Sequence, residues 1–369
     1  MTKEYTLKEV EFKAMEFLED AFDSNETTFK NYRTSINYFL YLMNCNKHRF
    51  SKINNDNKDN ALKKFKNCLL NGFTYEVESV DDVLGYSEEQ FKDVNVNFTF
   101  KPIKRNVKVN DNGVNTHLRR IITFFNQYLH FKIKKFQFCK VDKPKYKSLT
   151  EDHVELLINE CSNCWSKEEI ATRNATLIRF LYLNLLRIRE ALEVTIDDTN
   201  FIDYDSETNK AILNPNVDEE NYSIWIHQKS RSKKNTSITI NPKLAKDIID
   251  YINIKKVPSN YVFSTTRRST DGKAKALSRE WFNKDMIKLA SFVDERYDTK
   301  TKDYDNISEI VKNNSSHVFR HSRAVVELQN GLDIRTVQGA LRHSSLSSTE
   351  IYTEPSKKKV NNVRVNKYI

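Results

Sequence analysis

The sequence predicts a mainly helical protein with a small antiparallel β-sheet, folded as two domains. Three observations favour this class. The chain has 369 residues, enough for about two domains of ordinary size. It contains only six glycines and six prolines, too few for a turn-rich sandwich or barrel. Its longest apolar stretches repeat at steps of three and four residues, which is the spacing of one helix face.

The composition excludes several classes of protein. With 38% hydrophobic and 30% charged residues, the chain can bury cores and is not disordered. Arginines and an asparagine interrupt the longest apolar stretch, 177–192, and the N-terminus starts with charged residues, so we expect neither a membrane span nor a signal peptide. The odd number of cysteines, five, favours a reducing cytoplasm over a disulfide framework. The net charge of +10 permits a polyanionic partner without proving one.

The N-terminal part carries three helix-like stretches. Residues 27–43 and 114–131 place apolar side chains at steps of three and four, and each stretch predicts an amphipathic helix. Arg119 and Arg120 fall outside the apolar stripe of the second stretch. The apolar residues of 62–73 fit a further helix, although their surroundings, rich in Asn, Asp and Lys, show no clear period. We therefore expect a helical N-terminal domain.

A strongly basic segment, residues 132–147, separates the two halves of the chain. It has seven lysines against one acid and a proline at position 144, which predicts an extended, positively charged connection. On this basis we place an N-terminal domain at 1–145 and a C-terminal domain at 148–369, with a tail at 353–369. A solvated linker whose lysines serve only solubility fits the composition equally well.

The C-terminal part begins with a capped helix and continues with a long buried one. Thr150 precedes an apolar-periodic run and is the expected N-cap. The stripe over 178–192 predicts one buried helix that carries Arg187 and Glu190 near its end. A lysine-rich turn, 229–235, joins the last two strands of a small antiparallel sheet. This sheet is predicted by four short β-rich runs, at 201–202, 211–213, 222–227 and 236–240.

The last part of the chain is helical again. A helix that begins near Val318 ends close to Gly331, a plausible C-terminal cap, and the apolar period resumes over 334–341. Ser347 and Glu350 are three residues apart, which is the spacing of a capping box. They predict the start of a short helix.

Arginine, histidine and tyrosine residues occur in a fixed order across this C-terminal part. The sequence Leu186-Arg187-Ile188-Arg189-Glu190 comes first, followed by His317-Val318-Phe319-Arg320 and then by His343 and Tyr352. Arg320 and His343 are 23 residues apart, and His343 and Tyr352 are nine apart. Over about residues 148–353, the chain resembles the tyrosine recombinase (integrase) family. The signature of that family is an arginine in L-R-x-x-E, a strand-turn lysine, H-x-x-R, a second histidine or tryptophan, and a tyrosine.

The resemblance implies a transesterification on DNA that needs no cofactor and no metal. Tyr352 would be the nucleophile and would form a 3′-phosphotyrosyl link. Arg187 and Arg320 would stabilise the charge of the transition state with forked donors. His317 and His343 would add hydrogen bonds or proton transfers. The motif contains no carboxylate cluster of the kind that a two-metal nuclease needs.

The catalytic lysine has more than one candidate. Lys229 matches the strand-turn lysine and would protonate the leaving oxygen, whereas Lys233 or Lys234 could reach the site instead. Glu190 would orient a catalytic cation. Arg342 departs from the family pattern, since relatives usually have Leu-Gly-His where this chain has Leu-Arg-His. A cation there could touch DNA or alter the local turn.

The implied partner is double-stranded DNA with recombination sites. A two-domain DNA clamp would hold it, formed by a helical core-binding domain and a tyrosine-recombinase catalytic domain. The resemblance implies that monomers assemble into a homo-tetramer on DNA and exchange strands through a Holliday junction. Accessory DNA-bending proteins are further implied partners. The expected location is the cytoplasm, at the nucleoid. A type IB topoisomerase and a catalytically silent DNA-binding protein are the alternatives. The candidate DNA contacts are all basic: Arg119, Arg120, Lys134, Lys135, Lys143, Lys145, Arg231, Lys233, Lys234 and Arg342.

Overall fold

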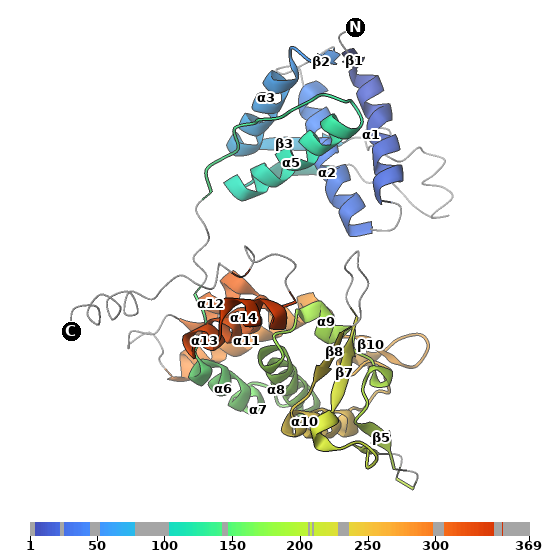
Figure 1. Cartoon of the computed structure of the whole chain (residues 1–369), viewed down its shortest axis with the longest axis vertical. Coiled ribbons are helices and arrows are strands. Elements are labelled where there is room, and N and C mark those ends of the chain that lie inside the picture. The colour runs from blue at the N-terminus through green and yellow to red at the C-terminus, as the bar shows by residue number, and fades with distance from the viewer. Residues whose placement is uncertain are drawn as a thin grey trace, which may run out of the picture. The chain divides into compact units, whose positions relative to one another are not determined.

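The computed structural model separates the chain into two compact units, residues 1–143 and 144–369 (Figure 1). None of the described helices is long and apolar enough to cross a membrane. The residues that the structure describes are 4–22, 26–44, 52–77, 103–141, 147–205, 207–208, 210–227, 236–297, 306–342 and 349.

In its described residues, the N-terminal unit is a group of helices with two short pairs of strands. The helices are α1 (Leu7–Phe22), α2 (Glu26–Asn44), α3 (Lys58–Asn71) and α5 (Asp111–Gln127). Both pairs are antiparallel: β1 (Glu4–Thr6) pairs with β2 (Lys52–Asn54), and β3 (Phe73–Val77) pairs with β4 (Ile103–Val107). The three predicted helices are confirmed as α2, α3 and α5, while α1 and both strand pairs had not been predicted.

Aromatic side chains form the centre of this unit. Phe39 of α2 lies edge-on against Phe65 of α3 and Phe125 of α5, with ring centroids 5.4 and 5.3 Å apart. All three rings are fully buried. The apolar faces that the periodicity predicted thus meet one another. Helix α5 ends earlier than the predicted residue 131, and His130 just beyond it has a positive φ of 54°.

The basic segment after α5 is held against the N-terminal unit. The Asn115 amide nitrogen donates to the Cys139 carbonyl (3.0 Å), and its oxygen accepts from the Cys139 amide (2.8 Å). Ile133 is buried in the core of the unit. Residues 132–141 of the predicted connection therefore pack along the N-terminal unit, because side chains of the unit bind that backbone.

The C-terminal unit is mainly helical, with three two-stranded hairpins. Its helices are α6 (Glu151–Asn159), α7 (Cys161–Cys164), α8 (Glu168–Leu183), α9 (Ile188–Leu192), α10 (Pro242–Ile254), α11 (Arg279–Tyr297), α12 (Ile307–Asn314), α13 (His317–Gln329) and α14 (Ile334–Ala340). Its strands are β5 (Ile202–Tyr204), β6 (Ala211–Leu213), β7 (Ser223–Ile226), β8 (Thr236–Thr239), β9 (Ser264–Arg268) and β10 (Ala274–Ala276).

The predicted strands are present, but as separate antiparallel ribbons instead of one sheet. Strand β5 pairs with β6, and β7 pairs with β8 in a register that places Ile224 opposite Ile238. One isolated bridge, between Thr199 and Ile224, lies next to the second ribbon. The third ribbon, β9 with β10, had not been predicted, because its polar and basic sequence is typical of a loop.

The prediction of one continuous helix over 178–192 is wrong. Helix α8 ends at Leu183, and α9 begins at Ile188. Leu185 between them has a φ of 47°, which no helix interior allows. The apolar stripe runs on through Leu185 and Leu186, so periodicity alone could not show the break. As a result, Arg187 stands at the N-terminal end of a new helix.

Candidate active site

Arg187 and Glu190 form the first contact of the predicted site. Arg187 precedes helix α9, and its backbone amide donates to Glu190 Oε2 at 2.9 Å. Its guanidinium donates to Glu190 Oε1 at 2.7 Å. The Glu190 carboxylate therefore accepts a hydrogen bond from an amide at the N-terminus of the helix, and it also orients the Arg187 side chain. The Arg187 side chain remains partly exposed.

The Glu190 carboxylate is buried and is shared by three arginines. Besides Arg187, the guanidinium of Arg342 lies 3.0 Å from Oε2 and that of Arg320 lies 3.9 Å from it. Burial by itself would raise the pKa of the Glu190 carboxyl, but the Arg342 charge and the hydrogen bonds from Arg187 outweigh it. The net result is a lowered pKa, so Glu190 is ionised at neutral pH.

Arg320 is almost completely buried on helix α13. It donates through Nη1 to the Leu185 carbonyl and through Nη2 to the Leu341 carbonyl. Those two carbonyls belong to the break between α8 and α9 and to the end of α14. Arg320 therefore connects three segments that are far apart in the sequence, and its bond to the Leu185 carbonyl stabilises the break between α8 and α9.

His317 is the first residue of helix α13 and is open to solvent. The amide of Ser316 before it donates to the Asn283 side chain of α11, which fixes the start of the helix. Desolvation lowers the pKa of His317, and the positive charges of Arg320, Arg187 and a third arginine lower it further. That arginine is Arg279, at the start of α11, which sequence reasoning missed because it belongs to no motif.

Three predicted catalytic residues, Lys229, His343 and Tyr352, lie outside the described residues. The capping pair Ser347 and Glu350 does too. Strand β7 leads toward Lys229 and is followed by His227, whose Nε2 lies 2.6 Å from Asp198 Oδ1. The structure thus brings together Arg187, Glu190, His317 and Arg320, which are part of the predicted set.

The predicted DNA contacts divide into exposed and inward-facing side chains. Lys134 and Lys135 are exposed, and so is Arg119, whose guanidinium lies over the ring of Phe138. Arg120 instead donates to the Asn31 carbonyl and the Ser35 hydroxyl of α2, both at 3.2 Å, which argues against a DNA contact. Arg342 likewise turns inward to Glu190. The remaining predicted DNA contacts lie outside the described residues: Lys143, Lys145, Arg231, Lys233 and Lys234.

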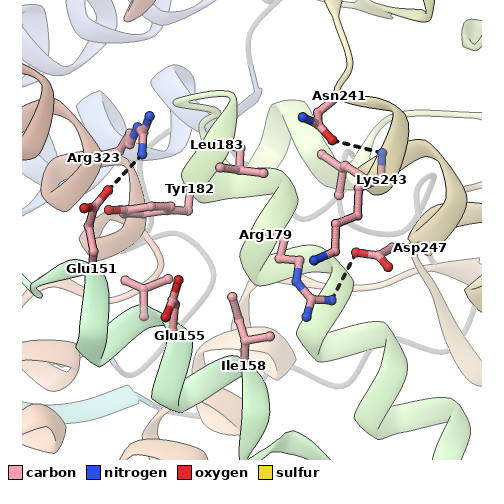
Figure 2. A pocket seen from close by; sticks show the side chains of 12 residues that line it. Glu151, Glu155, Ile158, Arg179, Tyr182, Leu183, Asn241, Lys243, Asp247 and Arg323 are labelled. Carbon is pink, nitrogen blue, oxygen red and sulfur yellow. Dashed lines mark hydrogen bonds and ion pairs between the residues drawn. The ribbon is translucent and has the colours of Figure 1, made fainter. Parts of the chain in front are cut away.

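A separate pocket of about 350 Å³ lies between α6, α8 and α10 (Figure 2). Ion pairs line it, Glu151 with Arg323 at 3.2 Å and Arg179 with Asp247 at 3.1 Å, and the ring of Tyr182 packs under the Arg323 guanidinium. Of the predicted catalytic residues, those that the structure describes do not line this pocket. Within the described ranges, no group of three His, Cys, Asp or Glu side chains could hold a metal ion.

Comparison with known proteins gives relatives of one kind. The tyrosine recombinase XerA of Pyrococcus horikoshii is 26% identical over 246 residues, which are 65% of this chain and 70% of that protein. The tyrosine recombinase XerD of Staphylococcus saprophyticus is 26% identical over 268 residues, which are 68% of this chain and 76% of that protein.

Solved structures share the fold. The XerH site-specific recombinase, in a pre-cleavage complex with its difH substrate, aligns over 97% of this chain and 84% of its own, with a TM-score of 0.55 and 16% identity. The Tn1549 transposon integrase, in complex with a circular intermediate DNA, aligns over 98% of this chain and 99% of its own, with a TM-score of 0.59 and 11% identity.

The family model supports the same assignment. Residues 147–359 match the phage integrase family. The match covers more than half of the chain and includes every predicted catalytic position from Arg187 to Tyr352. It also contains the cluster of arginines around Glu190. The chain therefore belongs to the phage integrase family and is a site-specific tyrosine recombinase, an enzyme that cuts and rejoins DNA.

Proposed function

We propose that the recombinase cleaves a DNA strand by attack of Tyr352 on a phosphodiester held by Arg187 and Arg320. The observation that carries this proposal is the meeting of both arginines at the Glu190 carboxylate. A buried anion between two cations holds them close while leaving a net positive charge for a phosphate. Arg187 is partly exposed and can reach a bound strand.

Each residue then has a defined chemical role. Attack of the Tyr352 oxygen on phosphorus, with its phenol proton passing to the neutral imidazole of His317, forms the 3′-phosphotyrosyl bond and breaks the bond to the 5′ oxygen, which Lys229 protonates as it leaves. Arg187 and Arg320 stabilise the nonbridging oxygens of the five-coordinate transition state. His317 has a lowered pKa, so it is neutral at pH 7 and can both donate and accept hydrogen bonds. His343 would assist at the same phosphate.

Strand exchange requires more than one copy of the site. We propose that four chains assemble on two DNA sites, starting from free monomers, and pass through a Holliday junction with the help of accessory DNA-bending proteins. The N-terminal unit would be the core-binding half of a DNA clamp. Its exposed Arg119, Lys134 and Lys135 would contribute phosphate contacts.

The biological setting that fits best is a mobile or chromosomal recombination system. The similar structures belong to the XerH recombinase and to an integrase of the transposon Tn1549. We propose that this chain acts on double-stranded recombination sites in the cytoplasm, at the nucleoid, as an integrase or a transposase.

Tyr352→Phe tests the proposal directly. The protein is incubated with genomic DNA, denatured, and the covalently joined DNA is recovered and sequenced. The wild type should yield adducts at a defined sequence, and Tyr352→Phe should bind that sequence with unchanged affinity but yield none, because only the nucleophilic oxygen is lost. Tyr368→Phe is the matched control in the tail and should form adducts normally. Adducts from Tyr352→Phe would overturn the assignment.

A further inference from the structure

Arg342 has a backbone conformation that an arginine rarely adopts. It follows helix α14, and its φ of 53° lies in the left-handed region that favours glycine. Its amide donates to the Gly339 carbonyl at 2.9 Å, so the conformation closes the end of the helix. Since a side chain with a Cβ is unfavourable there, its contacts must offset the strain.

The contacts of the Arg342 side chain are inside the site. Nη2 donates to the Leu185 carbonyl and to Glu190 Oε2, each at 3.0 Å, and Nη1 donates to the Ala340 carbonyl at 3.1 Å. The side chain is only 11% exposed. These bonds are charge-assisted, and one of them is made to a carboxylate. They tie the end of α14 to the break between α8 and α9.

This arrangement places Arg342 behind the residues that would bind phosphate. Glu190 Oε1 accepts from the Arg187 guanidinium, while Oε2 accepts from Arg342. The Leu185 carbonyl accepts from both Arg320 and Arg342. Moving Arg342 would therefore release Glu190, which binds Arg187, and the Leu185 carbonyl, which binds Arg320. Arg187 and Arg320 are the two proposed phosphate ligands.

We propose that Arg342 is a positioning residue that holds Glu190 and the Leu185 turn, and through them aims Arg187 and Arg320 at the DNA phosphate. This inference rests on the proposed roles of Arg187 and Arg320. It assigns to Arg342 a task inside the protein and no contact with DNA.

The test compares Arg342→Gly with wild type in single-turnover cleavage of a nicked duplex carrying the sequence recovered from the covalent adducts. Glycine fits the positive φ, so this variant should fold, as unfolding curves will verify. Cleavage at pH 7.5 should fall roughly ten- to a hundredfold, the range expected when a catalytic group is misplaced. The affinity for the duplex and its salt dependence should not change.

The pH profile separates positioning from a general structural role. The charged groups that face Glu190 are Arg187, Arg320, Arg342 and, at longer range, His317. Without Arg342, the charge that does most to lower the pKa of Glu190 against its burial is lost, so this pKa should rise and the acid limb of cleavage should move to higher pH. Arg342→Lys keeps the charge and should bring the limb back toward wild type.

Two outcomes would overturn the inference. One is wild-type cleavage by Arg342→Gly with an unchanged pH profile. The other is a loss of affinity as large as the loss of cleavage, with a weaker salt dependence, which would make Arg342 an ordinary DNA contact.

Arg187→Ala in the same assay keeps the two proposals apart. If it cleaves normally, the proposed function fails; if it is inactive while Arg342→Gly is normal, only the inference fails. Arg189→Ala, an exposed arginine on α9, should behave as wild type.

Discussion

Glu190 shows how a single acidic residue can arrange cations for phosphate chemistry. Its side chain is 7% exposed and contacts three guanidiniums, so the cluster keeps an excess of positive charge. A buried carboxylate without partners would be strongly unfavourable, and three arginines packed together without a carboxylate would repel one another. Each kind of group therefore stabilises the other, and in the proposed reaction the phosphate of the substrate would balance the remaining positive charge.

At the scale of single residues, we expect Arg187→Ala and Arg320→Ala each to slow DNA cleavage about 10²- to 10³-fold while changing DNA affinity little. Their donors matter most when negative charge builds up in the transition state, and this is the usual effect of removing one such donor. Cleavage rates and equilibrium binding of one duplex give the two numbers. If affinity fell as steeply as cleavage, these arginines would be phosphate anchors without a catalytic role.

Lys229 can be tested through the leaving group. Lys229→Ala should cleave ordinary DNA very slowly but recover on a duplex whose bridging 5′ oxygen is sulfur, because a thiolate leaves without being protonated. Lys233→Ala and Lys234→Ala are matched controls in the same turn and should lose only salt-dependent binding. Rescue by sulfur in one of these two variants, and not in Lys229→Ala, would transfer the role of acid to that lysine.

At the scale of elements, the contact between α2 and α5 contains a half-buried histidine. His117 Nδ1 lies 2.9 Å from the Ser35 hydroxyl, and burial, together with the charge of Arg120, lowers the pKa of His117 to about 4. An unfolded chain has the ordinary value of 6.5. Between pH 6.5 and pH 4, the unfolded chain therefore binds more protons than the folded one. The stability from the neutral imidazole is full above pH 6.5 and is lost as the pH falls toward 4.

We expect the N-terminal unit to lose up to about 3 kcal/mol from this residue across that pH range, since one pKa unit is worth about 1.4 kcal/mol. Urea unfolding read by pulse proteolysis at pH 7 and pH 5 should show a smaller decrease for His117→Asn than for wild type. His130→Asn, which changes an exposed histidine in a conformation that asparagine tolerates, should decrease as wild type does. Equal decreases in all three proteins would contradict the assignment.

The elements also show where sequence reasoning works and where it cannot. Amphipathic helices such as α2 and α5 were predictable, because one local period decides which face is buried. The break at Leu185 was not predictable, because the side chain that binds its carbonyl, Arg320, is 135 residues further along the chain. The packing of residues 132–141 against the N-terminal unit was missed for the same reason, since it depends on the amide of Asn115, which binds the Cys139 backbone.

At the scale of the whole molecule, order and spacing of residue types were enough to predict the family and four residues of the cluster. They could not show that Arg342 turns inward or that Arg279 stands near His317, because both depend on how distant helices meet. Charge alone likewise predicted Arg120 as a DNA contact, although its donors serve α2.

We expect DNA cleavage by the full-length protein to continue in excess EDTA. Arginine side chains supply the positive charge at the phosphate in the proposed reaction, so no divalent cation has a step to perform. Covalent adduct formation with and without chelator, at matched ionic strength, measures this. Loss of adducts that only added magnesium restores would contradict the mechanism.

The Leu185 carbonyl has a consequence for how the enzyme is made. Its bonds to Arg320 and Arg342 span 135 and 157 residues of chain. Contacts between such distant parts are the slowest to form during folding, because a long loop must first be closed. While the ribosome is still synthesising the protein, the partners of Leu185 do not yet exist. The arrangement of Arg187, Glu190 and Arg320 should therefore form only after nearly the whole polypeptide has been translated, and we expect incomplete chains not to cleave DNA.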